Sequence, residues 1–328
     1  MSAVLKADPV PLVKLRDLSV TFVTRDRTVH AVNGVDLDVM PGEVLCILGE
    51  SGSGKSVTLR ALMKLLPKFA RISGGIEVVG KDVTKMSERQ LANFRGTDVA
   101  MIFQEPMTAL DPVFTVGRQI AETVQRHEGA SRSAANARAL ELLELVQIPS
   151  ARRRLDAYPH ELSGGLRQRA MIAVALACRP KLLLADEPTT ALDATVQIQV
   201  LLLLRELQEQ LDMGVIFVTH DLGVAGEIAD KVAVMYAGRV VEEGPVAGLM
   251  AGPLHPYAQG LLGATVHAGM RGQRLTTIPG APPTLDVAPT NCAFAPRCPQ
   301  VRDECLERVP SLRQPEPGRR ARCVLLPQ

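Results

Sequence analysis

The sequence predicts an α/β fold with a largely parallel sheet, and three observations support this prediction. First, residues 49–56 read Gly-Glu-Ser-Gly-Ser-Gly-Lys-Ser, which fits the pattern Gly, four residues, Gly-Lys-Ser. Second, an apolar, β-prone run at 44–48 precedes this segment, and a helical pattern follows it until Pro67. Third, further short apolar runs end in polar residues, as strands do at the ligand-binding edge of such a sheet.

The segment at 49–56 is expected to bind the phosphates of a nucleotide. A strand, a glycine-rich turn and a helix start direct several backbone N–H groups, and the positive end of a helix dipole, to one place. Lys55 would reach the β- and γ-phosphates, and the Ser56 hydroxyl would ligate Mg²⁺. The predicted ATP-binding residues are those of this segment and the residue that follows it: Gly49, Glu50, Ser51, Gly52, Ser53, Gly54, Lys55, Ser56 and Val57.

Composition argues against several other classes of protein. The net charge is +2 over 328 residues, so the chain lacks the basic footprint of a nucleic-acid-binding protein. No apolar run approaches the ~20 residues needed to cross a bilayer. Residues 1–8 lack the apolar core of a signal peptide. We therefore expect a cytosolic protein, which can still dock on a membrane partner.

Residues 12–44 are rich in β-prone residues. Strands are predicted at 15–22 and 35–39, with a polar turn at 24–27 after the first of them. Phe22 lies at the end of the first strand. It is either an ordinary core residue or a surface on which a base stacks.

A helical insertion is predicted after the next strand. The apolar run at 99–103 reads as a buried strand and ends at Gln104, where ligands bind in open α/β sheets. Residues 105–160 then change to a helical pattern. The helix at 134–146 would carry Leu140, Leu143 and Val146 on its apolar side. These helices would stand between two strands of the sheet.

A second helix start follows this insertion. Leu162-Ser163-Gly164-Gly165 opens an apolar helix, and Ser163 is a good N-cap residue. Two adjacent glycines leave the first N–H groups of the helix uncovered. The segment is either an ordinary capped helix or a second anion site.

Two carboxylates end the next apolar strand. Asp186 is placed to hold Mg²⁺, and Glu187 could orient or deprotonate an attacking water. Asp193 precedes a helix predicted at 195–211, and His220 follows a strand predicted at 215–219. Five polar side chains are therefore expected at one edge of the sheet: Lys55, Gln104, Asp186, Glu187 and His220.

In this order the motifs resemble those of the nucleotide-binding subunits of ABC transporters, over residues 12–252. The resemblance implies a RecA-like core, an antiparallel β subdomain and a helical subdomain at about 105–175, all within an ATPase domain at 1–255. It also implies a small Cys-containing C-terminal extension at 256–328. Leu166 stands where many members have Gln, a departure that leaves the backbone anion site intact.

The resemblance implies a paired mechanism. Two such subunits would close head to tail around two ATP molecules. Each ATP would lie between the phosphate loop of one subunit and Ser163, Gly164 and Gly165 of the other, which accounts for the second helix start. Asp193 would lie at the subunit interface, and Phe22 would stack on adenine.

The resemblance also assigns the chemistry. Glu187 would be the general base, and His220 and Gln104 would contact the γ-phosphate, the attacking water or Mg²⁺. The implied Mg²⁺ ligands are Ser56, Gln104 and Asp186.

The C-terminal part resembles the ATP-binding subunits of oligopeptide and dipeptide importers. It contains His255-Pro256-Tyr257, then Ile-Pro-Gly-Ala-Pro-Pro at 278–283, then a cysteine-rich end. Nickel and glutathione importers belong to the same group. The implied partners are two transmembrane permease subunits, a second ATPase that is identical or paralogous, and an extracytoplasmic peptide-binding protein, but no nucleic acid. The chain would lie peripherally on the cytoplasmic face of the inner membrane.

Two other functions fit the same nucleotide motifs. An ABC-type ATPase acting on DNA or ribosomes usually carries long insertions or tandem copies, which this chain lacks. A scaffold that binds ATP only to dimerise would not need Glu187 as a base.

Four cysteines lie close together near the C-terminus: Cys292, Cys298, Cys305 and Cys323. They contain no Cys-x-x-Cys pair, so they do not match a zinc ribbon. They could hold a [4Fe–4S] cluster or Zn²⁺, or be free thiols, and the family resemblance favours the cluster. Nearby arginines (Arg297, Arg302 and Arg322) would suit a negatively charged site. Cys46 and Cys178 are predicted to be core thiols.

Overall fold

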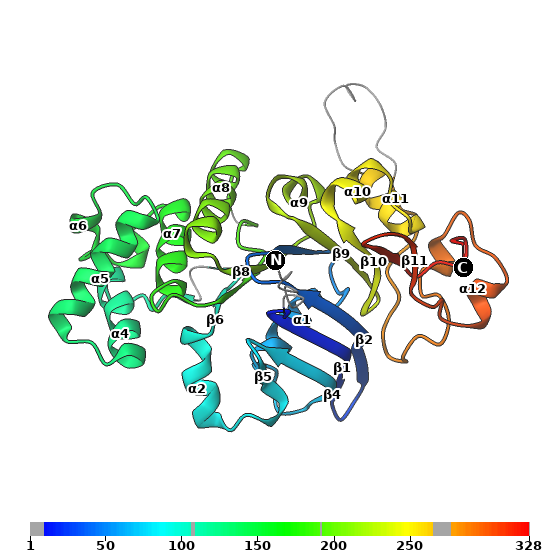
Figure 1. Ribbon diagram of the computed structural model, residues 1–328, viewed down its shortest axis with the longest axis horizontal. Coiled ribbons are helices and arrows are strands. Elements are labelled where there is room, and N and C mark those ends of the chain that lie inside the picture. Colours follow the sequence, from blue (N-terminus) through cyan, green and yellow to red (C-terminus); the bar gives the residue numbers. More distant parts are fainter. Residues whose placement is uncertain (1–9, 106–108, 191, 265–276, 328) are drawn as a thin grey trace, which may run out of the picture.

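The computed structural model describes residues 10–105, 109–190, 192–264 and 277–327. The N-terminal segment considered above, residues 1–8, lies outside the described residues. Figure 1 shows the helices α4 to α7 at one end of the long axis and the C-terminal segment with α12 at the other. The two sheets lie between these ends.

An eight-stranded sheet has the order β11-β12-β10-β9-β3-β8-β7-β6. Its parallel part joins β9, β3, β8, β7 and β6, and β10, β11 and β12 extend it with antiparallel pairings. Parallel strands buried on both faces read as continuous apolar runs, which is why these segments were predictable. The bounds are β3 (Val44–Leu48), β6 (Val99–Ile102), β7 (Leu182–Asp186), β8 (Gly214–Thr219), β9 (Lys231–Tyr236), β10 (Arg239–Pro245), β11 (Arg313–Glu316) and β12 (Arg319–Ala321).

A four-stranded antiparallel sheet has the order β2-β1-β4-β5. It comprises β1 (Val13–Val23), β2 (Thr28–Val39), β4 (Ala70–Val78) and β5 (Lys81–Asp82). The residues between β1 and β2 form the predicted polar turn. One hydrophobic core joins this sheet to the parallel sheet and to α1, through residues such as Leu15, Leu37, Ile47 and Leu59.

The helical insertion is present between β6 and β7. It contains α4 (Val116–Glu128), α5 (Arg132–Leu145), α6 (Ala151–Arg154), the 3₁₀ turn η2 (Pro159–Glu161) and α7 (Gly164–Ala175). The buried side of α5 differs in part from the prediction. Leu143 is fully buried, but Leu142 and Ala139 accompany it and Leu140 is only partly buried, because α4 and α7 both pack on this helix.

The remaining helices surround the sheets. They are α1 (Lys55–Leu62), η1 (Val83–Lys85), α2 (Glu88–Thr97), α8 (Ala194–Leu211), α9 (Leu222–Ile228), α10 (Val246–Ala251), α11 (Pro256–Gly263), η3 (Ala295–Arg297) and α12 (Glu304–Glu307). Helix α1 ends at Leu62, before the predicted stop at Pro67. Lys64 adopts a left-handed φ of 51°, and Arg95 donates hydrogen bonds to the free carbonyl oxygens of Met63 and Lys64.

The C-terminal segment continues the main sheet, since β12 pairs with β10 at Glu242 and Glu243. The division of the chain at 255/256 stays a prediction. Within the described part of the chain, no helix is both long and apolar enough to cross a membrane.

Candidate functional site

The phosphate loop connects β3 to α1, as predicted, and it passes very close to neighbouring backbone. A Cβ atom at Gly49 would lie 2.3 Å from Met235 O, and one at Gly54 would lie 2.5 Å from Ala31 O. Gly54 also has a φ of 100°. Both positions therefore require glycine for space, and Gly54 requires it for conformation as well. The close packing fixes the loop against β2 and β9.

Lys55 folds back over this loop. Its Nζ donates to Gly49 O at 2.7 Å and to Glu50 O at 3.0 Å, and the residue is 5% exposed. Burial lowers the pKa of Lys55, while the charges of Glu187 and Asp186 oppose that effect. Among the described residues, the hydrogen-bond partners of the ammonium group are therefore these two carbonyl oxygens, which a bound phosphate could replace.

Ser56 and Asp186 meet across the sheet edge. Ser56 Oγ donates to Asp186 Oδ1 at 2.6 Å, and Asp186 is 2% exposed at the end of β7. Burial raises the pKa of Asp186, with the Ser56 hydrogen bond and the Arg60 charge acting in the opposite direction. A hydroxyl and a buried carboxylate in contact are hard oxygen donors, and these suit Mg²⁺.

Glu187 stands at the centre of a polar group. Its Oε2 accepts hydrogen bonds from Thr190 Oγ1 at 3.0 Å and Gln104 Nε2 at 3.4 Å, and it lies 3.5 Å from His220 Nδ1. Glu187 has a φ of 46°, a left-handed conformation that costs energy for a residue with a side chain. Three predicted residues from three strand ends thus meet at one carboxylate.

Gln104, Glu187 and His220 line one cavity of about 810 Å³ with the phosphate loop. Phe22, Val29 and Ala31 form an apolar side of it, together with Leu261 and Leu285 from the C-terminal segment. Leu285 O accepts a hydrogen bond from His30 N at 2.7 Å, which pins this segment to β2. Neither leucine could be recognised from the sequence, because no local pattern distinguishes an apolar residue of a cavity wall from a core residue.

The second helix start lies away from this cavity within the same chain. Ser163 and Gly164 are exposed, and Ser163 Oγ caps α7 by accepting from Leu166 N at 3.4 Å. A Cβ atom at Gly165 would lie 2.6 Å from Val196 Cγ1, so this glycine also allows α7 to approach α8. Asp193 is the exposed N-cap of α8 and accepts from Val196 N at 3.1 Å. An ordinary capped helix that packs on α8 accounts for Gly165. It gives no packing reason for a glycine at position 164.

The four C-terminal cysteines line one small enclosed cavity with His255 and Phe294. Burial raises the pKa of the Cys292, Cys298 and Cys323 thiols. Within the described residues, however, no group of three or more His, Cys, Asp or Glu side chains is placed to hold a metal ion. The predicted [4Fe–4S] or zinc site is therefore not confirmed.

The interpretation of the surrounding arginines as partners of that site is wrong for Arg297. This side chain binds Glu50 of the phosphate loop at 2.7 Å. Arg322 lies 3.9 Å from Asp36, and Arg302 is exposed. Of the two core thiols, Cys46 is fully buried as predicted, whereas Cys178 is only partly buried.

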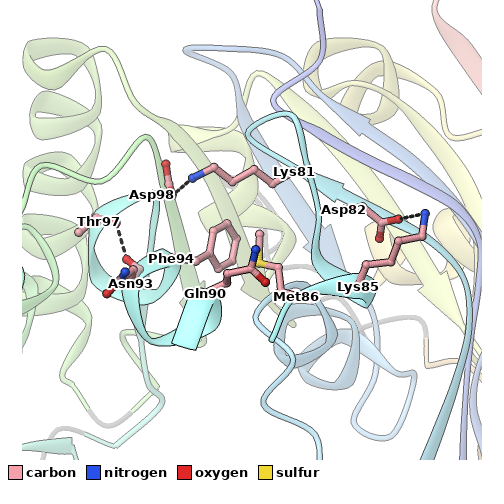
Figure 2. Close-up of a pocket in the computed structure, with 9 residues that line it drawn as sticks. All are labelled: Lys81, Asp82, Lys85, Met86, Gln90, Asn93, Phe94, Thr97 and Asp98. Atoms are coloured by element: carbon pink, nitrogen blue, oxygen red, sulfur yellow. Dashed lines mark hydrogen bonds and ion pairs between the residues drawn. The ribbon is translucent and has the colours of Figure 1, made fainter. Parts of the chain in front are cut away.

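A separate cavity of about 530 Å³ lies between η1 and α2 (Figure 2). Phe94 and Met86 line its apolar part. Lys81 pairs with Asp98 on one side, and Lys85 pairs with Asp82 on the other. Both lysines thus have carboxylate partners. This cavity shares no lining residue with the cavity at the phosphate loop.

The fold and the site define a phosphate-loop ATPase in which a helical group is inserted into a mainly parallel sheet. Family comparison agrees: a model described as ABC transporter matches residues 32–190. A second model, described as the C-terminal region of oligopeptide/dipeptide transporters, matches residues 241–305.

Individual relatives cover nearly the whole chain. The oligopeptide transport ATP-binding protein OppD of Bacillus subtilis is 50% identical over 291 residues, which are 87% of this chain and 81% of that protein. OppD of Salmonella typhimurium is 47% identical over 312 residues, 95% of this chain and 93% of that protein. Among solved structures, a dimeric ATP-binding cassette bound to ADP and Pi is similar with a TM-score of 0.64 and 30% identity, over 71% of this chain and 98% of that one. The chain belongs to the ABC transporter ATP-binding proteins of the oligopeptide/dipeptide importer type.

Proposed function

We propose that the chain is the ATP-binding and ATP-hydrolysing subunit of an importer for dipeptides or oligopeptides. The observation that supports this most is that Ser56, Gln104, Glu187 and His220 line the phosphate-loop cavity, with Asp186 hydrogen-bonded to Ser56. The C-terminal family match favours peptides over nickel or glutathione as cargo. It also favours membrane permeases over DNA or ribosomes as the partners.

The proposed mechanism uses groups already in place. The phosphates of ATP bind the N–H groups of the loop, and Lys55 exchanges its carbonyl partners for phosphate oxygens. Ser56 and Asp186, with Gln104 nearby, would hold Mg²⁺, which would supply positive charge to offset that of the phosphates. Glu187 takes the proton from the attacking water, and Gln104 and His220 orient that water and the γ-phosphate.

The proposal includes a head-to-tail dimer. Ser163, Gly164 and Gly165 are too far from their own cavity to line it, yet Ser163 and Gly164 are exposed at a helix N-terminus. In a dimer this helix start covers the γ-phosphate on the partner subunit, and Asp193 lies in the interface. The related cassette solved as a dimer with ADP and Pi supports this arrangement.

The assembly follows from the family. We propose that two such ATPases, identical or paralogous, dock on two transmembrane permease subunits at the cytoplasmic face of the inner membrane. An extracytoplasmic peptide-binding protein delivers the cargo. Within the chain, the ATPase domain would span residues 1–255 with its helical subdomain at about 105–175, and the extension would span 256–328.

A [4Fe–4S] cluster on Cys292, Cys298, Cys305 and Cys323, or Zn²⁺ in its place, is a further part of the proposal. Its basis is the family resemblance, together with the observation that all four cysteines line one small cavity. The four side chains would have to move apart to admit either group, and they would have to release their protons, because burial favours the neutral thiols without a metal.

Two substitutions test the central function. Glu187→Gln should keep ATP binding and lower ATP turnover by about 10²–10⁴-fold, the usual contribution of a general base. Lys55→Ala should abolish binding of Mg-ATP, whereas Lys68→Ala, at an exposed lysine, should not. Calorimetry measures the binding of ATP, and phosphate release by the complex with its membrane subunits measures the turnover. Unchanged turnover in Glu187→Gln would remove Glu187 as the base, and co-purification with nucleic acid would contradict the importer.

A further inference from the structure

The C-terminal segment holds the phosphate loop through an ion pair whose arginine is buried and whose glutamate is partly exposed. Arg297, at the end of η3, donates from Nη1 to Glu50 Oε2 at 2.7 Å and from Nη2 to Glu50 Oε1 at 3.0 Å. The arginine side chain is 5% exposed and that of Glu50 is 27% exposed. Two parallel charge-assisted hydrogen bonds fix the orientation of the carboxylate as well as its position.

The backbone of Glu50 is held from the same direction. Glu50 N donates to Tyr257 Oη at 2.9 Å. Tyr257 lies on α11, next to Tyr236 at a ring distance of 4.6 Å. Both the main chain and the side chain of the second residue of the phosphate loop are therefore fixed by residues beyond position 255.

Arg297 is itself held in a single orientation. Its Nε donates to Pro279 O at 2.8 Å, and its Nη1 also lies 3.3 Å from Tyr236 Oη. The guanidinium group thus uses three nitrogens on three partners. This arrangement is typical of an arginine that positions another group, rather than of one that only solubilises the surface.

The position of Glu50 matters for the rest of the loop. Glu50 O accepts hydrogen bonds from Ser53 N at 3.2 Å and from Lys55 Nζ at 3.0 Å. A shift of Glu50 would therefore move the turn that presents the phosphate-binding N–H groups. A loop already held in its binding conformation loses less entropy when the nucleotide binds.

We propose that Arg297 is a positioning residue for the phosphate loop, so that the C-terminal segment is an integral part of the nucleotide site. The proposal rests on the ATP-binding function proposed above. It predicts two effects of losing Arg297. The loop loses its preformed geometry, and the Glu50 carboxylate is left unpaired beside the phosphates, where it repels ATP more than ADP.

The test measures dissociation constants of Mg-ATP and Mg-ADP for the full-length chain by calorimetry, with thermal unfolding recorded on each variant. Arg297→Ala should weaken ATP binding about tenfold and ADP binding less. In the background of Glu50→Gln, which removes the carboxylate charge, the effect of Arg297→Ala should shrink at least several-fold. Arg297→Lys, which keeps the charge but cannot form the bidentate pair, should give an intermediate affinity.

Arg313→Ala is the matched control, because Arg313 lies in the same segment and donates to the backbone oxygen of Val324. It should lower the unfolding temperature without changing nucleotide affinity. Unchanged affinity in folded Arg297→Ala, or equal losses in Arg297→Ala and Arg313→Ala, would overturn the proposal. If Arg297→Ala does not fold, Arg297→Lys with wild-type affinity would overturn it instead. Failure of the wild-type chain to bind ATP would contradict the ATP-binding function itself.

Discussion

Ser56 Oγ lies 2.6 Å from Asp186 Oδ1, although the two residues are 130 positions apart in the chain. Ser56 lies in the first turn of α1, which follows β3, and Asp186 ends β7. The strand β8 lies between β3 and β7 and is parallel to both. Because parallel strands present their carboxyl ends at one edge, this topology alone brings the two oxygens together. The site depends on strand order more than on any local contact.

The charged Asp186 carboxylate should lower the stability of the protein when no nucleotide is bound. Burial raises its pKa, so the folded state binds the proton more readily than the unfolded state. The charged carboxylate therefore destabilises the fold at pH values above the raised pKa, and the cost disappears below the unfolded value near 4. Asp186→Asn should raise the unfolding temperature at pH 7 by about 2 °C or more, while abolishing Mg-ATP hydrolysis.

Thermal unfolding between pH 4 and pH 8 measures the effect of this substitution. The advantage of Asp186→Asn should shrink as the pH falls. Ser56→Ala provides the opposite control, since it removes a hydrogen bond to the carboxylate and should destabilise the protein at pH 7. A lower unfolding temperature for Asp186→Asn at pH 7 would contradict the prediction.

His255 should make the protein sensitive to mild acid. It is 2% exposed, its Nδ1 accepts from Tyr257 N at 3.0 Å, and burial lowers its pKa from 6.5 to about 4. The folded state resists protonation, so stability is lost as the pH falls from 6.5 towards 4. The pKa change corresponds to roughly 3 kcal/mol of unfolding free energy.

His255→Asn keeps an acceptor for the helix cap but takes up no proton in this range. Urea unfolding at a series of pH values should therefore show a flatter slope between pH 6.5 and 4 in this variant. His160→Asn, at an exposed histidine, should leave the slope unchanged. Equal slopes for His255→Asn and the wild-type protein would rule out His255 as the source of acid sensitivity.

Ser163 should be needed for turnover and not for binding ATP to a single chain. Ser163→Ala removes the cap of α7 and should cost about 1 kcal/mol of stability, as at any N-cap. If the helix start contacts the partner's γ-phosphate, ATP hydrolysis should fall at least tenfold, while the affinity of the isolated chain for ATP stays the same.

Ser131 offers a matched control, because it caps α5 through a hydrogen bond from Ala134 N at 3.2 Å. Ser131→Ala should cost similar stability with little effect on hydrolysis. Equal losses of hydrolysis in Ser131→Ala and Ser163→Ala would mean that Ser163 acts only through the stability of its helix. Phosphate release by the assembled complex, and calorimetry on the single chain, separate these outcomes.

The cysteine cavity should contain a bound cofactor in protein purified without oxygen. A [4Fe–4S] cluster would make the protein brown, with broad visible absorption and bound iron and sulfide. Cys298→Ser should lose the colour, whereas Cys178→Ser should keep it. Colourless protein with one equivalent of zinc would support the zinc alternative, and metal-free protein in which all six thiols titrate after unfolding would refute both.

Much of the fold could be predicted because its central strands are locally recognisable. The strands that lead to Gln104, Asp186 and His220 are mainly continuous apolar runs, since both faces are buried. Other features depended on distant contacts. The end of α1 at Leu62 depends on Arg95, and the buried side of α5 depends on two neighbouring helices, so neither could be inferred from periodicity.

By itself, the sequence determined the phosphate loop, the polar strand ends and the family, because each of these is encoded in a short run of residue types. Only the tertiary structure decided that Arg297 holds Glu50 rather than surrounding the cysteines, and that Leu285 lines the nucleotide cavity. The physical reason is that an ion pair or an apolar contact between residues more than 200 positions apart depends on how the chain packs. The residues that neighbour an arginine in the sequence do not indicate which carboxylate its side chain will pair with in the folded protein.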